Sequence, residues 1–142
     1  MTQPLEEVEA LALRLTKDCI VTYPVLPQAG LAMLQLEEGA LGTAFYLGEF
    51  PLAKCEVSLQ LADGRQVTGA AQIMDDRVEF AQALAVLDAI LAHQLLGCDE
   101  AQVLLSAGMK KIADDEAIRQ RMLAQTRVDF SMLSVAQGED DD

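Results

Sequence analysis

Cysteine and histidine, the usual ligands of zinc, are few and widely spaced in this sequence. The single histidine is His93, and the three cysteines are Cys19, Cys55 and Cys98, with no C-x-x-C pair among them. A structural zinc site needs four such ligands, usually in closely spaced pairs. We therefore predict no metal site, and three reduced thiols that pack as small apolar side chains.

Asp88 and His93 are the two side chains of the longest apolar segment that could transfer a proton. At about 100° per residue, Asp88 lies roughly 40° from Leu84, inside an apolar helical stripe. A carboxylate there either pairs with a cation such as Lys54 or Arg127, caps a neighbouring backbone, or contacts a ligand or subunit. His93 lies on the opposite side, which favours a surface histidine over a general acid–base.

The charge balance restricts what the chain can bind alone. Lys and Arg number 10 and Asp and Glu 23, which gives a formal net charge of −13. Nucleic-acid binding needs a basic face, so we predict no contact with DNA or RNA. For a polyanionic small molecule, another chain would have to supply much of the positive charge. The sequence has no P-loop, G-x-G-x-x-G, G-x-S-x-G or H-E-x-x-H motif, so we expect no cofactor in this chain.

Helical spacing at the N-terminus gives way to strand patterns in the middle of the chain. Residues 4–18 repeat apolar side chains at helical spacing, so they predict a first helix. Strand-forming stretches follow at residues 19–26, 30–38, 43–64 and 65–74. Within residues 43–64, apolar side chains alternate with polar ones, which predicts a strand with one buried face. The apolar residues are Cys55, Val57, Leu59 and Leu61, and Ser58 is among the polar ones. Asp63-Gly64 predicts a hairpin turn, and Gly48-Glu49 inside a strand indicates a bulge or a close backbone approach.

The apolar period changes at Asp75, where a long helix is predicted. It runs to Gly97, with Asp75 or Asp76 as its N-cap. The expected apolar stripe is Phe80, Leu84, Leu87, Leu91 and Leu95. The alanines that allow close packing are Ala81, Ala85, Ala89 and Ala92.

Two further helices are predicted after the long one. The first covers residues 99–108, and the second covers residues 110–127 and is polar and charged. An ion pair between Asp115 and Arg119 is expected at i,i+4 spacing in the second.

Strands joined by hairpins, with helices before and after them, predict an α+β fold. We expect an antiparallel sheet of about four strands packed against the long helix of the C-terminal half, with further helices at the N- and C-termini. A single domain is expected over residues 1–136, followed by a disordered acidic tail over 137–142. No apolar run approaches the ~18 residues of a membrane span, and the acidic N-terminus lacks the basic start of a secretory signal. We therefore predict a cytoplasmic protein without membrane contact.

A polar, alternating stretch, "TRVDFSML", occupies residues 126–133. Val128 and Phe130 alternate with Arg127 and Asp129, as in an extended segment with one apolar side. Such a segment near a chain end is ordered when another subunit holds it. Packing of the stretch on its own domain is the alternative.

Three stretches, taken together, resemble one family. They are residues 45–69, which hold an LGE strand and a D-G hairpin, residues 78–91, an alanine-rich helix, and residues 126–133, with T-x-V-x-F. Their order and content resemble PhnG, the small subunit of the bacterial carbon–phosphorus lyase core complex. Lys54 stands where that family tends to have arginine. Met74-Asp75-Asp76 replaces the usual Gly-Arg-Asp, which leaves Arg77 as a substitute one position later.

The matched motifs and Asp88 supply the candidate contact residues, without assigning a catalytic one. The candidates for partner or substrate contact are Gly48, Glu49, Lys54, Arg77, Asp88, Arg127, Asp129 and Phe130.

The resemblance implies a place in phosphonate breakdown. Members of the family act with PhnH, PhnI and PhnL to transfer methylphosphonate to the ribose C1 of ATP. Adenine is released and α-D-ribose 1-methylphosphonate 5-triphosphate is formed. PhnI-like proteins hold the nucleosidase activity, and PhnJ, a radical iron–sulfur enzyme, then breaks the C–P bond. On this resemblance the chain would assist or scaffold a PhnI-like partner, and ATP would be a substrate of the complex.

Two other functions stay open at this level. The chain could be a free-standing homo-oligomeric module, for example a homodimer, that binds a small ligand or regulator. It could also be an independent enzyme that uses Asp88 and His93, for which the sequence offers the least support.

Overall fold

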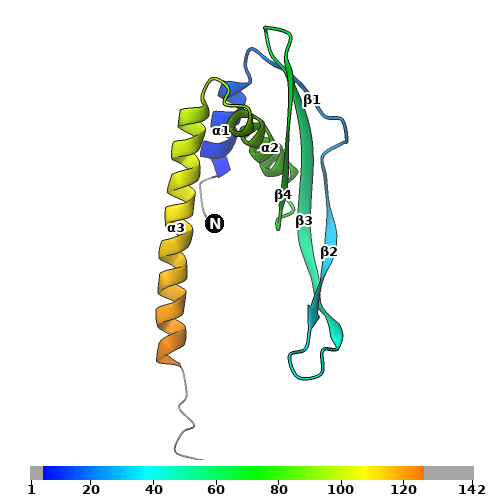
Figure 1. The fold of residues 1–142 in the computed structure, drawn as a ribbon, viewed down its shortest axis with the longest axis vertical. Coiled ribbons are helices and arrows are strands. Elements are labelled where there is room, and N and C mark those ends of the chain that lie inside the picture. Colours follow the sequence, from blue (N-terminus) through cyan, green and yellow to red (C-terminus); the bar gives the residue numbers. More distant parts are fainter. Residues whose placement is uncertain (1–4, 127–142) are drawn as a thin grey trace, which may run out of the picture. The chain divides into compact units, whose positions relative to one another are not determined.

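The computed structural model of the chain describes residues 5–126. It contains α1 (Leu5–Leu15), β1 (Ile20–Thr22), β2 (Gln28–Glu37), β3 (Ala44–Gln60), β4 (Gln66–Ile73), α2 (Val78–Ala92) and α3 (Cys98–Gln125) (Figure 1). The chain forms two compact units, residues 1–106 and residues 107–142. The first holds the sheet, α1, α2 and the start of α3, and the described part of the second is the remainder of α3. The predicted α+β class with a four-strand antiparallel sheet is confirmed.

β3 is the central strand of the sheet, and all its pairings are antiparallel. β4 pairs with β3 over Ala53–Gln60, β2 pairs with it over Ala44–Lys54, and β1 pairs with it over Ser58–Gln60. The β2 and β1 pairings each share residues of β3 with the β4 pairing, so both must use the other edge of β3. β2 and β1 therefore lie one after the other along that edge. The predicted hairpin turn is confirmed, with the Leu61 N–H donating to the Arg65 carbonyl at 2.8 Å and Gly64 at φ +85°.

Alternation along β3 builds one side of the core. Ala53, Cys55, Val57 and Leu59 are buried, whereas Lys54, Glu56 and Gln60 are exposed. Ser58 was expected on the exposed face and this is wrong, because it is 2% exposed. Its hydroxyl accepts a hydrogen bond from the Gln66 side-chain amide at 2.7 Å, and this bond offsets the cost of removing the hydroxyl from water.

α2 packs on this face through small side chains. Its alanines Ala81, Ala85 and Ala89 are fully buried, whereas Phe80, Leu84 and Leu91 of the predicted stripe are only half-buried. Gly69 of β4 explains the preference for small residues. A Cβ built on Gly69 would lie 2.3 Å from the Ala85 carbonyl oxygen and 2.5 Å from the Ala89 nitrogen, so the helix backbone approaches the strand directly.

The ends of α2 differ from the prediction. The N-cap is Arg77, which makes no side-chain capping bond, and the Asp75 carboxylate instead accepts from the Arg77 backbone N–H at 2.9 Å. The helix ends at Ala92 and not at Gly97. Gln94 and Gly97 both adopt left-handed backbone angles (φ 49° and 90°), so the chain leaves the helix earlier and turns twice before α3.

The two predicted C-terminal helices are one. α3 runs unbroken through Cys98–Gln125, because Gly108 is the strongest helix breaker between the two segments and costs only about 1 kcal/mol. The predicted Asp115–Arg119 pair is replaced by Arg119 with Glu116 at 3.8 Å, an i,i+3 pair. Within residues 5–126, no helix is long and apolar enough to cross a membrane.

Candidate functional site

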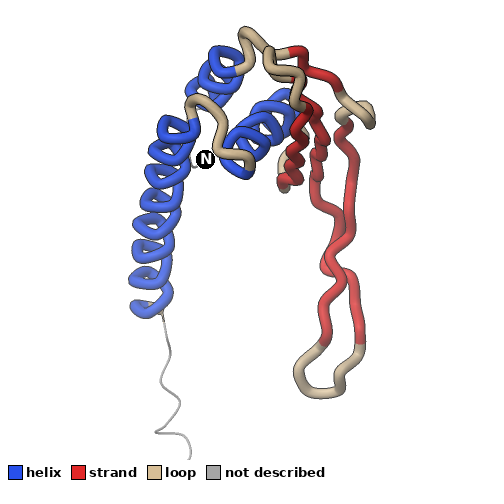
Figure 2. The backbone as a smooth tube through the Cα atoms, turned by 45° about the horizontal axis from the view of Figure 1, so that its top comes forward, coloured by secondary structure: helices blue, strands red, loops and turns tan. Residues whose placement is uncertain are grey.

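The most unusual feature of the first unit is a two-stranded ribbon that continues past the rest of the sheet. β4 reaches β3 only as far as Ala53, so beyond this point β3 pairs with β2 alone. We call residues 28–52 the hairpin arm: β2, the turn after it, and β3 as far as Leu52. Figure 2 shows both strands of the arm running on beyond α1 and α2 of the same unit. An isolated two-stranded ribbon is marginally stable in water.

Large apolar side chains are exposed along the whole arm. Leu41 at its turn is 83% exposed and Leu31 is 69% exposed. The full set of exposed large apolar residues on the arm is Leu31, Met33, Leu34, Leu36, Leu41, Phe45, Tyr46 and Leu47. Monomeric proteins rarely leave so many together, and such a patch marks a binding surface.

Both faces of the arm are apolar. The register pairs Leu36 with Phe45, so these two share one face with Leu34, two residues back along β2. Met33 and Leu31 lie on the other face, which also carries Tyr46. A strand with one face on a core and one in water alternates apolar with polar, and the arm departs from that pattern because apolar side chains lie on both of its faces.

Gly48 forms the predicted bulge in the arm, which is confirmed. Met33 pairs with Glu49 and Gln35 pairs with Tyr46. Two residues of β3, Leu47 and Gly48, therefore lie opposite one residue of β2, Leu34. Gly48 has φ +140°, and a Cβ placed on it would meet nothing within 4 Å. The position therefore requires glycine for its backbone angle and not for space.

Glu38 fixes the turn at the end of the arm. Its carboxylate accepts from the Leu41 N–H at 2.9 Å, and its backbone N–H donates to the Thr43 carbonyl at 3.0 Å. Gly42, at φ +64°, closes the turn with an N–H bond to the Glu38 carbonyl at 2.9 Å. The turn is thus an ordered structure that presents Leu41 outward.

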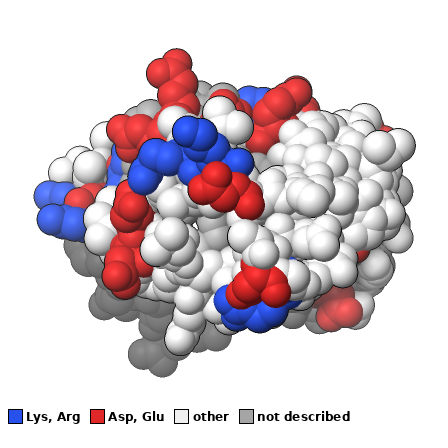
Figure 3. Space-filling view, turned by 90° about the horizontal axis from the view of Figure 1, so that it is seen from above, with Lys and Arg blue, Asp and Glu red and all other residues white. Residues whose placement is uncertain are grey.

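The charged residues of the arm are all acidic: Glu37, Glu38 and Glu49. The sequence has no Lys or Arg between Lys17 and Lys54. Glu37 and Glu49 are exposed, and the register places both on the face that carries Met33. Figure 3, a view from above, shows acidic and basic side chains gathered on part of the surface and a broad area beside them without Lys, Arg, Asp or Glu.

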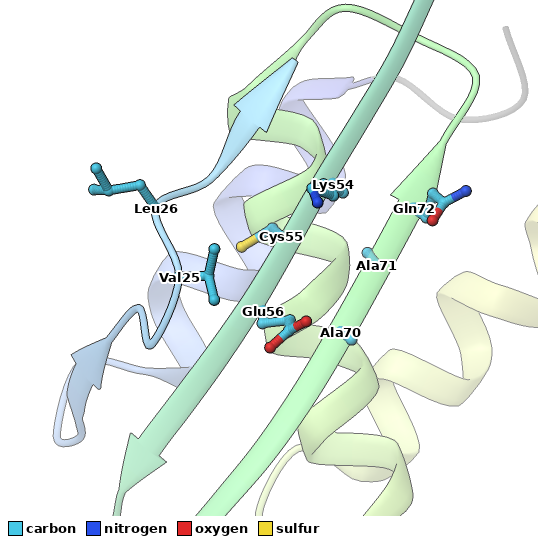
Figure 4. A pocket seen from close by; sticks show the side chains of 8 residues that line it. All are labelled: Val25, Leu26, Lys54, Cys55, Glu56, Ala70, Ala71 and Gln72. Carbon is cyan, nitrogen blue, oxygen red and sulfur yellow. The ribbon is translucent and has the colours of Figure 1, made fainter. Parts of the chain in front are cut away.

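A shallow pocket lies at the base of the arm and contains the candidate Lys54. It is lined by Val25, Leu26, Lys54, Cys55, Glu56, Ala70, Ala71 and Gln72 (Figure 4). Within residues 5–126, the Lys54 ammonium forms no ion pair. Glu56 lies two positions along on the same exposed face of β3 and counters the charge of Lys54. The pocket therefore offers one cation beside one anion, a poor setting for a triphosphate.

Arg77, another candidate, is occupied by its own neighbours. Its Nε donates to the Asp75 carboxylate at 2.7 Å, a second guanidinium nitrogen also contacts that carboxylate, and its Cζ lies 5.4 Å from the Phe80 ring centroid. The hydrogen bonds from the Arg77 side chain and backbone hold the pKa of the Asp75 carboxyl well below its usual range. This arrangement supports the turn before α2, and it commits the guanidinium to a local contact.

Asp88 caps a strand edge. Its carboxylate accepts a hydrogen bond from the backbone N–H of Ala70 at 3.0 Å. β4 is an edge strand, so this N–H would otherwise be open to another chain. Of the alternatives for Asp88, the cap of a neighbouring backbone is confirmed, and the ion pair with Lys54 is wrong.

The remaining reactive groups are unremarkable in their surroundings. His93 is exposed, as predicted. Cys55 is buried, and Cys19 and Cys98 are half-buried. Burial, with a smaller effect of Glu56, raises the pKa of the Cys55 thiol, which disfavours the reactive thiolate. Among residues 5–126, no three His, Cys, Asp or Glu side chains gather closely enough to hold a metal ion.

The candidate residues are not brought into one site. Gly48 and Glu49 lie in the middle of the arm, Lys54 at its base, and Arg77 and Asp88 on α2 or just before it. Arg127, Asp129 and Phe130 lie outside the described residues. The sequence reasoning missed the exposed apolar side chains of the arm. The sequence did contain a signal for this exposure. Residues 28–52 carry leucine and aromatic residues at both odd and even positions of two strands, and they include no Lys or Arg.

Two comparisons with known proteins bear on this chain. The family model described as "Phosphonate metabolism protein PhnG" matches residues 1–135. No curated protein matches the chain.

Proposed function

We propose a subunit function for this chain, which belongs to the PhnG family of phosphonate metabolism proteins. The proposed complex is the carbon–phosphorus lyase core complex of the cytoplasm, with PhnI-, PhnH- and PhnJ-like subunits as partners. The reaction is the transfer of methylphosphonate to the ribose C1 of ATP. A phosphonate oxygen forms the new bond to C1, the bond from C1 to adenine breaks, and the product is α-D-ribose 1-methylphosphonate 5-triphosphate.

The hairpin arm is the observation that carries this proposal. Burying one large apolar side chain contributes about 1.5–3 kcal/mol, and eight are exposed on the arm. Together they offer on the order of 10 kcal/mol, comparable with the ~4–15 kcal/mol that association costs in lost freedom. A ribbon of this composition can therefore supply enough apolar contact to offset the cost of association with another subunit.

The charges of the chain favour an assisting role over catalysis. A triphosphate and a phosphonate bring several negative charges to one place, and the net charge of this chain is −13. The pocket at the base of the arm offers Lys54 next to Glu56, and Arg77 is bound to Asp75. A more basic PhnI-like partner would have to supply the cations for substrate binding.

The same pocket supports a second candidate function, a free-standing module that binds a small ligand. Its apolar residues Val25 and Leu26, beside Cys55, could accept a small apolar group (Figure 4). This function predicts a stable homo-oligomer that binds a metabolite without any other subunit.

Co-expression with a PhnI-like protein from the same operon separates the two functions. We expect the two chains to purify together at near-equal amounts. We also expect adenine release from ATP and methylphosphonate by the reconstituted complex and none by the isolated chain. Adenine release by the isolated chain, or no association with the PhnI-like protein, would contradict the proposal.

A further inference from the structure

The acidic charges of the hairpin arm indicate what kind of surface covers it. The arm carries Glu37, Glu38 and Glu49 and no Lys or Arg. Glu38 binds the backbone of its own turn through its carboxylate. Glu37 and Glu49 are exposed and project from one face of the ribbon, beside the apolar side chains of Met33 and Tyr46.

We propose that the arm lies in an apolar groove of the PhnI-like subunit, with arginine or lysine side chains at the rim of that groove paired to Glu37 and Glu49. The inference rests on the proposed function and adds the surface and its chemistry. Apolar contacts on both faces of the arm supply the affinity. The two carboxylates set the register and the choice of partner, since like charges brought together at an interface cost several kcal/mol.

Charge also decides against a second copy of this chain as the occupant. Two arms packed together would place acidic residues near acidic residues with no basic residue on either arm. The copies would also approach with a net charge of −13 each. A basic partner removes both penalties, and its attraction to the arm speeds association.

The test compares two double variants that change the net charge equally. Glu37→Lys with Glu49→Lys reverses the arm charges. Glu7→Lys with Asp18→Lys reverses two exposed acidic residues away from the arm. Dissociation constants for the PhnI-like subunit would be measured at 50 and 500 mM salt. Circular dichroism and the urea midpoint show that each variant is folded.

We expect the arm variant to bind about tenfold more weakly or worse at 50 mM salt, because each reversed charge meets a like charge. The control should bind within about threefold of the wild type, because its charges are distant from the arm and screened. The difference between the arm variant and the wild type should shrink at 500 mM salt.

An apolar double variant, Leu34→Ser with Phe45→Ser, completes the test. It should weaken binding at both salt concentrations, because the loss of apolar contact does not depend on screening. If the arm variant binds the PhnI-like subunit as tightly as the wild type does, the inference is overturned and the subunit function still stands. Failure of the wild-type chain to bind would remove the subunit function itself. A stable homodimer of the isolated chain, lost only in the apolar variant, would show that a second copy covers the arm.

Discussion

The close approach of α2 to β4 makes Gly69 the most sensitive position of the fold. A Cβ at Gly69 would lie 2.3 Å from the Ala85 carbonyl oxygen, 2.5 Å from the Ala89 nitrogen and 2.8 Å from the Ala89 Cβ. The first two are backbone atoms, so no side-chain rotation relieves the clash. Gly69→Ala must therefore push the helix away from the sheet and loosen the contacts of the fully buried Ala85 and Ala89.

The expected loss follows from two opposing effects. Overpacking a tight interface by one carbon costs about 1–3 kcal/mol, and the backbone contacts place this site at the upper end. Replacing glycine with alanine also restricts the unfolded chain, which returns about 0.4–1 kcal/mol. We expect a net loss of about 2 kcal/mol in the free energy of unfolding, which lowers the urea midpoint by roughly 1 M for a protein of this size.

Gly30→Ala is the matched control. Gly30 also lies in a strand, but a Cβ on it would meet nothing within 4 Å and its backbone angle is ordinary. We expect its urea midpoint to equal that of the wild type or to rise slightly. Equal midpoints for Gly69→Ala and Gly30→Ala would refute the packing described for α2 and β4.

Three further predictions concern single polar or reactive groups. Asp88→Ala removes the acceptor of the Ala70 N–H and should cost about 1 kcal/mol in urea unfolding, whereas Asp88→Asn, which keeps an acceptor oxygen, should cost less; equal stabilities would show that the contact is unimportant. Asp75 has a lowered pKa because Arg77 donates to its charged form, so its contribution to stability is present above the ordinary carboxyl pKa of 3.8 and is lost as the pH falls below it. The urea midpoints of the wild type and Asp75→Asn should therefore differ by a constant amount from pH 5 to 7 and converge below pH 4, and a gap that widens on acidification would contradict this. Cys55 is buried with a raised pKa, so iodoacetamide at pH 8 should modify it at least about tenfold more slowly than the two half-buried thiols, as followed by peptide mass spectrometry; equal rates would contradict its burial.

Local patterns predicted the elements well where one physical effect dominated. The alternation from Cys55 to Leu59 located the core face of β3, and Asp63-Gly64 located its hairpin turn. Gly48 marked the bulge, because few other residues tolerate its backbone angle. These features depend on residues near one another in sequence.

Features that depend on distant contacts were harder to predict. Ser58 was placed on the wrong face because its partner, Gln66, lies on another strand. The sequence pattern did not show that the alanines of α2 pack against β4, because Gly69, which demands small residues opposite it, lies in that strand. The exposure of the arm was missed for a similar reason. Its apolar residues have the composition of ordinary strand residues, and they are exposed because β4 ends at Ile73 and does not reach this part of β3.

Hydrogen exchange of the arm backbone is the most direct measurement of the central claim that another subunit covers the arm. In the isolated chain, we predict that amides of residues 29–37 and 44–52 exchange much faster than those of residues 53–60, which β4 and α2 protect. In the complex with the PhnI-like subunit, exchange of the arm amides should slow by at least about tenfold, while the 53–60 amides change little. Arm amides that exchange equally fast in the free chain and in a verified complex would contradict the account.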